Sequence, residues 1–277
     1  NMEANWDLQQ HLVGLSSAGE PRWRLALSSH ATIDAAFAMG GSPALDKSRL
    51  WLPLGSIAKA FDAVGKGTLL VVDVADAGAS IIGSVALPAL ANCRTARRAG
   101  PVDAGNRRGA DANVAVVVVC SGAFSDGPAQ QLQRSGLAFL RADAQGTTTV
   151  TRVVPAAAIG DRPLGFGLAT DTTRAFVITL GDLEAGSADA LWRVDIDSGA
   201  ALKISDGSGA FHLSSLWHDD VQRRLWVSDN GVSGRPLGDA SSPVGDLRIF
   251  DTSGEVVFHG ALESNPKGLR ALELAPW

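Results

Sequence analysis

The side chains of this sequence that could do chemistry recur at one kind of place, directly before an apolar segment that we expect to be a strand. Imidazole, carboxylate, guanidinium, amide and ammonium groups can bind a ligand there through hydrogen bonds or charge. Because the positions are equivalent in a repeated pattern, we expect them to converge on one face. The set is His30, Asp161, Arg162, His212, Asn265 and Lys267. The alternative is that they are solvated loop residues, since titratable clusters only sometimes mark a site.

Asp229 and Asn230 are two further candidates, because they end a predicted strand at residues 224–229 and open a long loop. Their oxygens could contact a ligand held by that loop. The sequence Asp-Asn-Gly is also common in tight turns, and a turn is the interpretation we favour. We add both residues to the predicted ligand-binding set.

Metal binding and catalysis have less support than ligand binding. The sequence contains no Gly-x-Ser-x-Gly, no His-Glu-x-x-His, no phosphate-binding Gly-x-x-x-x-Gly-Lys-Ser and no zinc-type cysteine spacing. A divalent metal would need two or more histidines with a carboxylate, and only His30 and His212 qualify by position. A metal-assisted hydrolase of the lactonase type, using these two with Asp161 and Asp229, is the second hypothesis. Apart from this possible divalent metal, the cofactor stays unknown at the level of the sequence.

Residues 217–220, Trp-His-Asp-Asp, form a dense polar cluster in a turn between two predicted strands. This turn corresponds to residues 170–172 of the preceding repeat, and we expect an aspartate there to cap the turn by accepting hydrogen bonds from backbone N–H groups. His218 as a metal ligand or a base is the less favoured interpretation, because this turn lies at the opposite end of the strands from the long loops.

Copies of one hairpin pattern predict the fold. Each copy has an apolar strand, a turn rich in Asp, Ser and Gly, and a second strand, as in Leu-Trp-Arg-Val-Asp-Ile-Asp-Ser-Gly from residue 191. Glycine takes the positive φ that such turns need. The copies begin at residues 11, 69, 137, 191 and 247. Two more strands precede each copy except the first, so the complete unit is four antiparallel strands, the blade of a β-propeller.

We therefore predict an all-β fold, a single five-bladed β-propeller. Four blades occupy residues 32–86, 87–155, 160–204 and 210–262, and the fifth is split between residues 1–31 and 265–277. Pairing of residues 269–274 with residues 12–15 would close the ring and cover exposed strand edges. The first strand of the third blade is expected at residues 87–95. Residues 1–7 offer no good second strand for the split blade.

The segment Leu-Trp-Val-Ser-Asp-Asn-Gly from residue 225, followed by Gly-Asp-Leu-Arg-Ile-Phe-Asp from residue 245, resembles bacterial secreted propellers of the YVTN/YncE-like group. The resemblance covers residues 160–275 well and residues 35–155 loosely. Propellers of that group usually have seven blades, whereas the pattern here supplies five. The resemblance implies a fold and no particular activity, because propellers include lectins, lactonases, glycosidases and adaptors.

Long connections between the second and third strands of each blade point to a functional face. Long loops gathered on one side of a rigid scaffold are a common location for binding sites. The predicted connections are residues 55–67, 121–135, 181–189 and 229–244. We expect a binding or scaffold module whose site for a small molecule or a protein partner lies on this long-loop face.

Cys93 and Cys120 are the two cysteines of the chain. They flank the turn-like residues 100–112 almost symmetrically, so we expect them to lie opposite each other on antiparallel strands. Opposed residues bring Cβ atoms to roughly 4.5–5.5 Å, close to what a disulfide needs. We predict a disulfide, which suits an exported protein. Two buried thiols are the alternative.

Composition and charge argue against some classes of partner. The chain has 277 residues, with 24 Lys and Arg against 29 Asp and Glu, a net charge of −5. No basic field favours nucleic acid or an anionic membrane surface, and no apolar run is long enough to insert into a bilayer. The chain begins at Asn1 and shows no leader pattern. We expect a processed protein of the periplasm or the secreted fraction.

Overall fold

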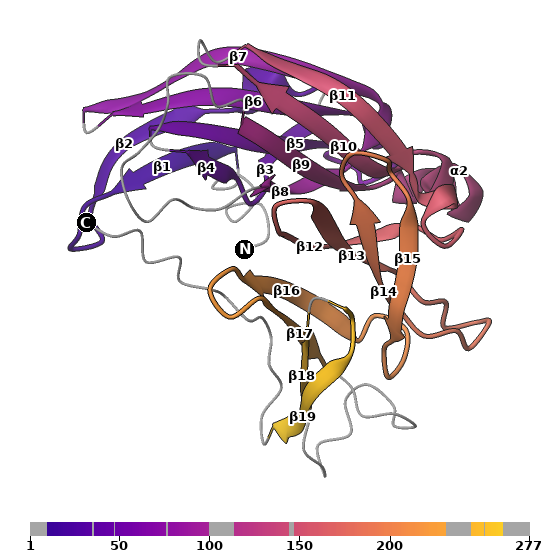
Figure 1. The fold of residues 1–277 in the computed structure, drawn as a ribbon. Coiled ribbons are helices and arrows are strands. Elements are labelled where there is room, and N and C mark those ends of the chain that lie inside the picture. Colours follow the sequence, from indigo (N-terminus) through magenta and orange to yellow (C-terminus); the bar gives the residue numbers. More distant parts are fainter. Residues whose placement is uncertain are drawn as a thin grey trace. The chain divides into compact units, whose positions relative to one another are not determined.

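The computed structural model describes residues 10–262, except residues 35, 47, 76, 100–113, 144–146, 231–244 and 252. Regular structure there is mainly antiparallel β-sheet, which confirms the predicted all-β class (Figure 1). Contacts divide the chain into two compact units. The first comprises residues 1–98 and 110–157, and the second comprises residues 99–109 and 158–277.

The first unit contains three sheets in its described part. A two-stranded sheet pairs β1 (His11–Leu15) with β2 (Pro21–Ala26). The next has the order β3-β5-β6-β7, with β4 paired to β5; the strands are β3 (Ala36–Gly40), β4 (Ala44–Asp46), β5 (Arg49–Ala58), β6 (Lys66–Ala75) and β7 (Gly78–Ala91). The third has the order β11-β10-β9-β8; the strands are β8 (Cys93–Ala99), β9 (Val114–Ser121), β10 (Ser135–Ala142) and β11 (Thr148–Pro155). Short helices are η1 (Ser28–His30), η2 (Phe124–Asp126), α2 (Pro128–Gln133) and η3 (Ala156–Ala158).

The second unit contains two four-stranded sheets in the residues described. One consists of β12 (Leu164–Thr170), β13 (Arg174–Thr179), β14 (Ala190–Asp195) and β15 (Ala201–Asp206), in that order. The other consists of β16 (Leu213–Asp219), β17 (Arg224–Asp229), β18 (Gly245–Phe250) and β19 (Val256–Leu262), also in order. Four consecutive antiparallel strands per sheet is the topology of a propeller blade. The chain therefore has a β-propeller fold.

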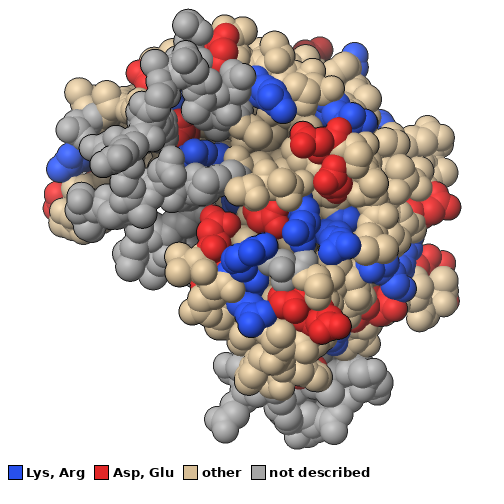
Figure 2. All heavy atoms as spheres, viewed as in Figure 1, with Lys and Arg blue, Asp and Glu red and all other residues tan. Residues whose placement is uncertain are grey.

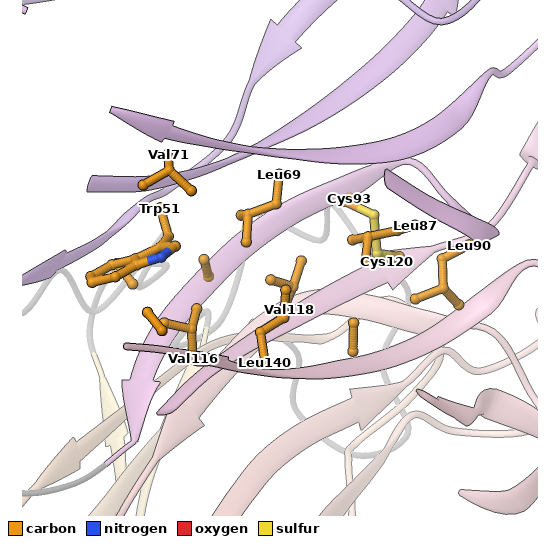
Figure 3. Close-up of a cluster of buried hydrophobic side chains, with 14 residues drawn as sticks. Trp51, Leu69, Val71, Leu87, Leu90, Cys93, Val116, Val118, Cys120 and Leu140 are labelled. Carbon is orange, nitrogen blue, oxygen red and sulfur yellow. A yellow bond between two sulfur atoms is a disulfide. The ribbon is translucent and has the colours of Figure 1, made fainter. Parts of the chain in front are cut away.

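Each unit buries a core between neighbouring sheets. In the first unit, Trp51 and Val71 of the β3–β7 sheet belong to the same buried cluster as Val116, Val118 and Cys120 of β9 (Figure 3). The run of valines in β9 is continuous because this central strand is covered on both faces. In the second unit, residues of β12–β14 and of β16–β18 form one shared cluster: Ala169, Phe176, Ile178, Leu191, Leu213, Leu216, Leu225, Val227 and Phe250.

Aspartates fix the turns between the first and second strands of both blades in the second unit. The Asp171 Oδ1 accepts hydrogen bonds from the backbone N–H groups of Thr173 and Arg174, at 2.8 and 2.7 Å. The Asp219 Oδ1 accepts from the N–H groups of Val221 and Gln222, at 2.9 and 3.0 Å. The prediction that an aspartate caps this turn is confirmed, and the structure shows that Asp171 and Asp219 are the residues that do so.

The disulfide between Cys93 and Cys120 is present, as predicted, and it joins β8 to β9. The expected first strand of the third blade, residues 87–95, was wrong. Residues 87–91 complete β7, and β8 begins only at Cys93. Residues 87–91 therefore belong to an edge strand, and Pro88 lies where the register with β6 shifts, a position in which proline is tolerated. Asn92, with φ 51°, turns the chain between the two strands.

Two other expectations differ from the structure or fall outside it. The connection predicted at residues 55–67 is shorter, because β5 continues to Ala58 and β6 begins at Lys66. Residues 265–277, which carry the predicted closure of the ring, lie outside the described residues. Within the part of the chain that the structure describes, no helix is long and apolar enough to cross a membrane.

Candidate functional site

The loop at residues 207–212, between β15 and β16, is held by hydrogen bonds to two buried carboxylates, those of Asp189 and Asp229. The carboxylate of Asp189, next to the start of β14, is fully buried and binds three backbone N–H groups. Its Oδ1 accepts from Gly181 at 2.6 Å and from Phe211 at 2.9 Å, and its Oδ2 accepts from Leu213 at 2.8 Å. One carboxylate therefore fixes the end of the loop and joins it to the β13–β14 connection.

Asp229, at the end of β17, fixes the beginning of the same loop. Its Oδ1 accepts from the Ser208 hydroxyl at 2.5 Å, and its Oδ2 accepts from the Ser208 backbone N–H at 2.8 Å. The Arg248 guanidinium donates to Oδ2 at 2.7 Å and to the Asp206 carbonyl at 2.6 Å. The Asp229 side chain is fully buried, so its ion pair with Arg248 and its hydrogen bonds to Ser208 hold the start of the loop against β17 and β18.

Phe211 and His212 are the residues that this clamped loop places at its end. Phe211 has φ 61°, a conformation that costs free energy in a residue with a bulky side chain, and it remains 49% exposed. His212 is only 5% exposed, and its Nδ1 lies 2.7 Å from the Ser208 hydroxyl. The loop therefore holds an aromatic ring at the surface beside an anchored imidazole.

A second connection, at residues 160–163 before β12, is hydrogen-bonded into the same region. Arg162 donates from Nη1 to the Ser187 hydroxyl at 3.0 Å and to the Ala188 carbonyl at 2.7 Å. Asp161 is exposed and has φ 56°. Hydrogen bonds thus link the 160–163 connection to the 181–189 connection, and Asp189 links the latter to the 207–212 loop.

The predicted site residues fall into three groups. Asp161, Arg162, His212, Asp229 and Asn230 all lie at this loop end of the second unit, where the Asn230 N–H donates to the His212 carbonyl at 2.7 Å. The first unit contains His30, which ends η1. The described residues do not include Asn265 and Lys267. Four residues that contribute to this region are not among those predicted from the sequence: Asp189, Ser208, Phe211 and Arg248.

The described residues offer few side chains that could bind one metal ion together. No group of three His, Cys, Asp or Glu side chains in these residues could hold an ion. Asp229, one of the suggested ligands, is already bound by Ser208 and Arg248. The ring of His218 stacks on Phe176 at a centroid distance of 5.7 Å, and its Nδ1 lies 2.9 Å from Asp220. His218 therefore serves packing at the opposite strand ends.

Figure 2 shows basic and acidic side chains interspersed over the described surface in this view. Several of them pair locally, as Lys203 does with Asp206 at 2.8 Å. Such interspersed charge provides local hydrogen bonds instead of an extended field of one sign.

No family model and no curated protein matches this sequence. Among solved structures, the chain is similar to the hydrazine synthase of Kuenenia stuttgartiensis, with 14% identity and a TM-score of 0.51. That match covers 89% of this chain and 59% of the other. A likeness at this identity shows the fold alone.

Two structures named as propellers are also matched. The Dos1 propeller has 14% identity and a TM-score of 0.47, over 91% of this chain and 51% of that one. The β-propeller domain of the Trilobed protease from Pyrococcus furiosus has 10% identity and a TM-score of 0.40, over 84% of this chain and 59% of that one. This chain thus spans about half to three fifths of these structures. These matches support a propeller fold and do not specifically indicate the YVTN/YncE-like group.

Proposed function

We propose that this protein is a β-propeller binding module whose ligand, a small molecule or a segment of a protein partner, contacts the loop end of the second unit. Phe211 and His212 on the 207–212 loop and Arg162 and Asp161 on the 160–163 connection supply the contacts. Asp189 and Asp229 serve as the buried anchors that hold those connections in place.

The observation that carries the proposal is the exposed, strained Phe211 on a loop fixed by two buried carboxylates. Burying a carboxylate is costly unless its hydrogen bonds are satisfied, and backbone strain persists only where the surroundings impose it. Here both features maintain a large aromatic side chain in contact with solvent. A pre-ordered aromatic contact saves the entropy that binding would otherwise cost.

Export from the cytoplasm is part of the proposal. The Cys93–Cys120 disulfide supports it, because disulfides persist in oxidising compartments such as the periplasm or the extracellular space. Determining the redox state of these cysteines in protein recovered from its native cells, with thiols blocked at lysis, tests the idea. Free thiols in that material would contradict it.

A ligand screen by saturation-transfer NMR tests the binding function. We expect compounds that bind the native protein to lose most of their signal with Phe211→Ala. The matched control is Phe258→Ala, which removes a phenylalanine of similar exposure, 50% against 49%, from the outer strand β19. Equal binding by the two variants would place the ligand elsewhere and overturn the proposal.

A further inference from the structure

Ser208 connects a buried carboxylate to the imidazole of His212. Its hydroxyl lies 2.5 Å from the Asp229 Oδ1 and 2.7 Å from the His212 Nδ1. The Ser208 backbone N–H and the Arg248 guanidinium bind the other carboxylate oxygen, Oδ2. These contacts form a chain of three side chains, Asp229, Ser208 and His212.

The chain determines which nitrogen of His212 carries the proton. A carboxylate paired with a guanidinium can only accept, so the single hydroxyl proton of Ser208 points to Asp229. The hydroxyl oxygen must then accept a hydrogen bond from His212, and the proton of the neutral ring is on Nδ1. Nε2 is left with a lone pair, as in histidines whose other nitrogen is held by a supporting group.

Gly209 packs closely against one edge of this ring. A Cβ at position 209 would lie 2.6 Å from the His212 Cε1, 2.8 Å from its Nδ1 and 3.2 Å from its Nε2. Any side chain larger than hydrogen would therefore displace the ring. The loop fixes the ring through Ser208 at Nδ1 and through Gly209 at the neighbouring Cε1.

The geometry points to the His212 Nε2 as a neutral hydrogen-bond acceptor for a ring compound that presents an N–H or O–H group. Ser208 and Asp229 hold the imidazole in the tautomer that leaves Nε2 unprotonated. The adjacent exposed ring of Phe211 offers a flat apolar surface on which such a compound can stack. This inference rests on the proposed function, because it specifies the chemistry of the same site. Ser208 and Asp229 are positioning residues and do not contact the ligand.

Nitrogen NMR of the ligand-free, full-length protein tests the chain directly. At mildly alkaline pH, where imidazoles are neutral, long-range ¹H–¹⁵N correlations should show His212 with a protonated Nδ1 and a bare Nε2. A protonated Nε2 in the wild-type protein would overturn the inference. This measurement requires neither a ligand nor a variant.

Serine variants show whether the hydroxyl is responsible. Ser208→Ala should abolish the preference for the Nδ1–H form, and Ser208→Thr, which retains the hydroxyl, should restore it. The control is Ser214→Ala, which removes a hydroxyl bonded to Ser228 and should leave the His212 signals unchanged. An unaltered tautomer in Ser208→Ala, with native thermal stability, would contradict the positioning role.

Diethyl pyrocarbonate, which reacts with unprotonated imidazole nitrogens, tests whether Nε2 is accessible. Mass spectrometry should show His212 modified several-fold faster than His218, whose Nε2 is buried. Equal rates at the two histidines would contradict an accessible Nε2 at His212 and overturn the inference. Failure of the Phe211 binding test with the tautomer intact would remove the binding function alone, so the two failures are distinguishable.

Discussion

At the scale of single residues, the molecule uses carboxylates mainly to hold its own backbone. Asp189 accepts hydrogen bonds from three backbone N–H groups, of which those of Gly181 and Leu213 are buried. Asp229 accepts from both the backbone N–H and the hydroxyl of Ser208. The sequence places Asp229 among the candidate ligands. In the structure its carboxylate binds the Ser208 hydroxyl, which in turn contacts His212, so Asp229 has a positioning role.

Asp189→Ala should lower the free energy of unfolding by about 3 kcal/mol or more, because each buried N–H group left without an acceptor costs about 1–3 kcal/mol. Urea unfolding measures the loss. Asp182→Ala is the control in the same connection, since Asp182 is exposed and its hydrogen bonds to Glu184 and Ala185 are solvated; the expected loss is below about 1 kcal/mol. Equal losses would contradict the anchoring role of Asp189.

The sequence identifies His212, Asp161 and Arg162 as site candidates because their place before a strand is visible in the repeat. Phe211 and Asp189 are not visible in that way. The importance of Phe211 depends on its positive φ, and that of Asp189 depends on Gly181 and Leu213, which are eight and twenty-four residues away along the chain. Such contacts arise only when the sheets are assembled.

At the scale of elements, the outer hairpins share one turn chemistry. Asp251 accepts hydrogen bonds from the hydroxyl of Ser253 and from the N–H groups of Ser253, Gly254 and Glu255. The hydrogen bond from the Ser253 hydroxyl is the largest cause that lowers the pKa of Asp251 below its ordinary value. Ser198 lowers the pKa of Asp195 in the same way in the neighbouring blade. Each ionised carboxylate therefore stabilises its turn.

Asp251→Ala should destabilise the protein at neutral pH and progressively less in acid. A pKa lowered by folding contributes stability above the pKa of the unfolded chain, and this stability is lost as the pH falls through the lower, folded value. Thermal unfolding of the variant and the wild type across this pH range measures the difference between their melting temperatures. A difference in melting temperature between wild type and Asp251→Ala that grows as the pH falls would contradict this account.

The disulfide is an element-scale restraint between β8 and β9. Replacing Cys93 and Cys120 together by alanine should cost about 3.5 kcal/mol in the chain-entropy model for a loop of 27 residues. Urea unfolding of the double variant provides the comparison. Thiol titration of the denatured, unreduced wild type should find no reactive thiol; two per chain would mean that the bridge is absent in solution.

The strand pattern of the sequence predicts most elements correctly because blade strands alternate with turns rich in Asp and Gly. It fails at residues 87–95, where an apolar run contains both the end of β7 and the start of β8. Periodicity cannot divide such a run. The break falls at Asn92, a residue type that tolerates the left-handed conformation found there.

At the scale of the whole molecule, the β-propeller fold follows from repeated four-stranded sheets, and ring closure by residues 269–274 stays a prediction. Its support is that β1 pairs only with β2 among the described strands. Deleting residues 266–277 should therefore expose a strand edge and cause aggregation or a lower melting temperature. Light scattering and calorimetry compare the two proteins. A truncated chain that stays monomeric with unchanged melting would contradict closure.

Amide chemical-shift mapping tests the central claim, that ligand binding occurs at the loop end of the second unit. The full-length, ¹⁵N-labelled protein is titrated with a compound from the saturation-transfer screen. We predict saturable shifts at residues 160–163, 181–189 and 207–213, with residues 256–262 of β19 unaffected. Saturable shifts confined to other residues would contradict the account.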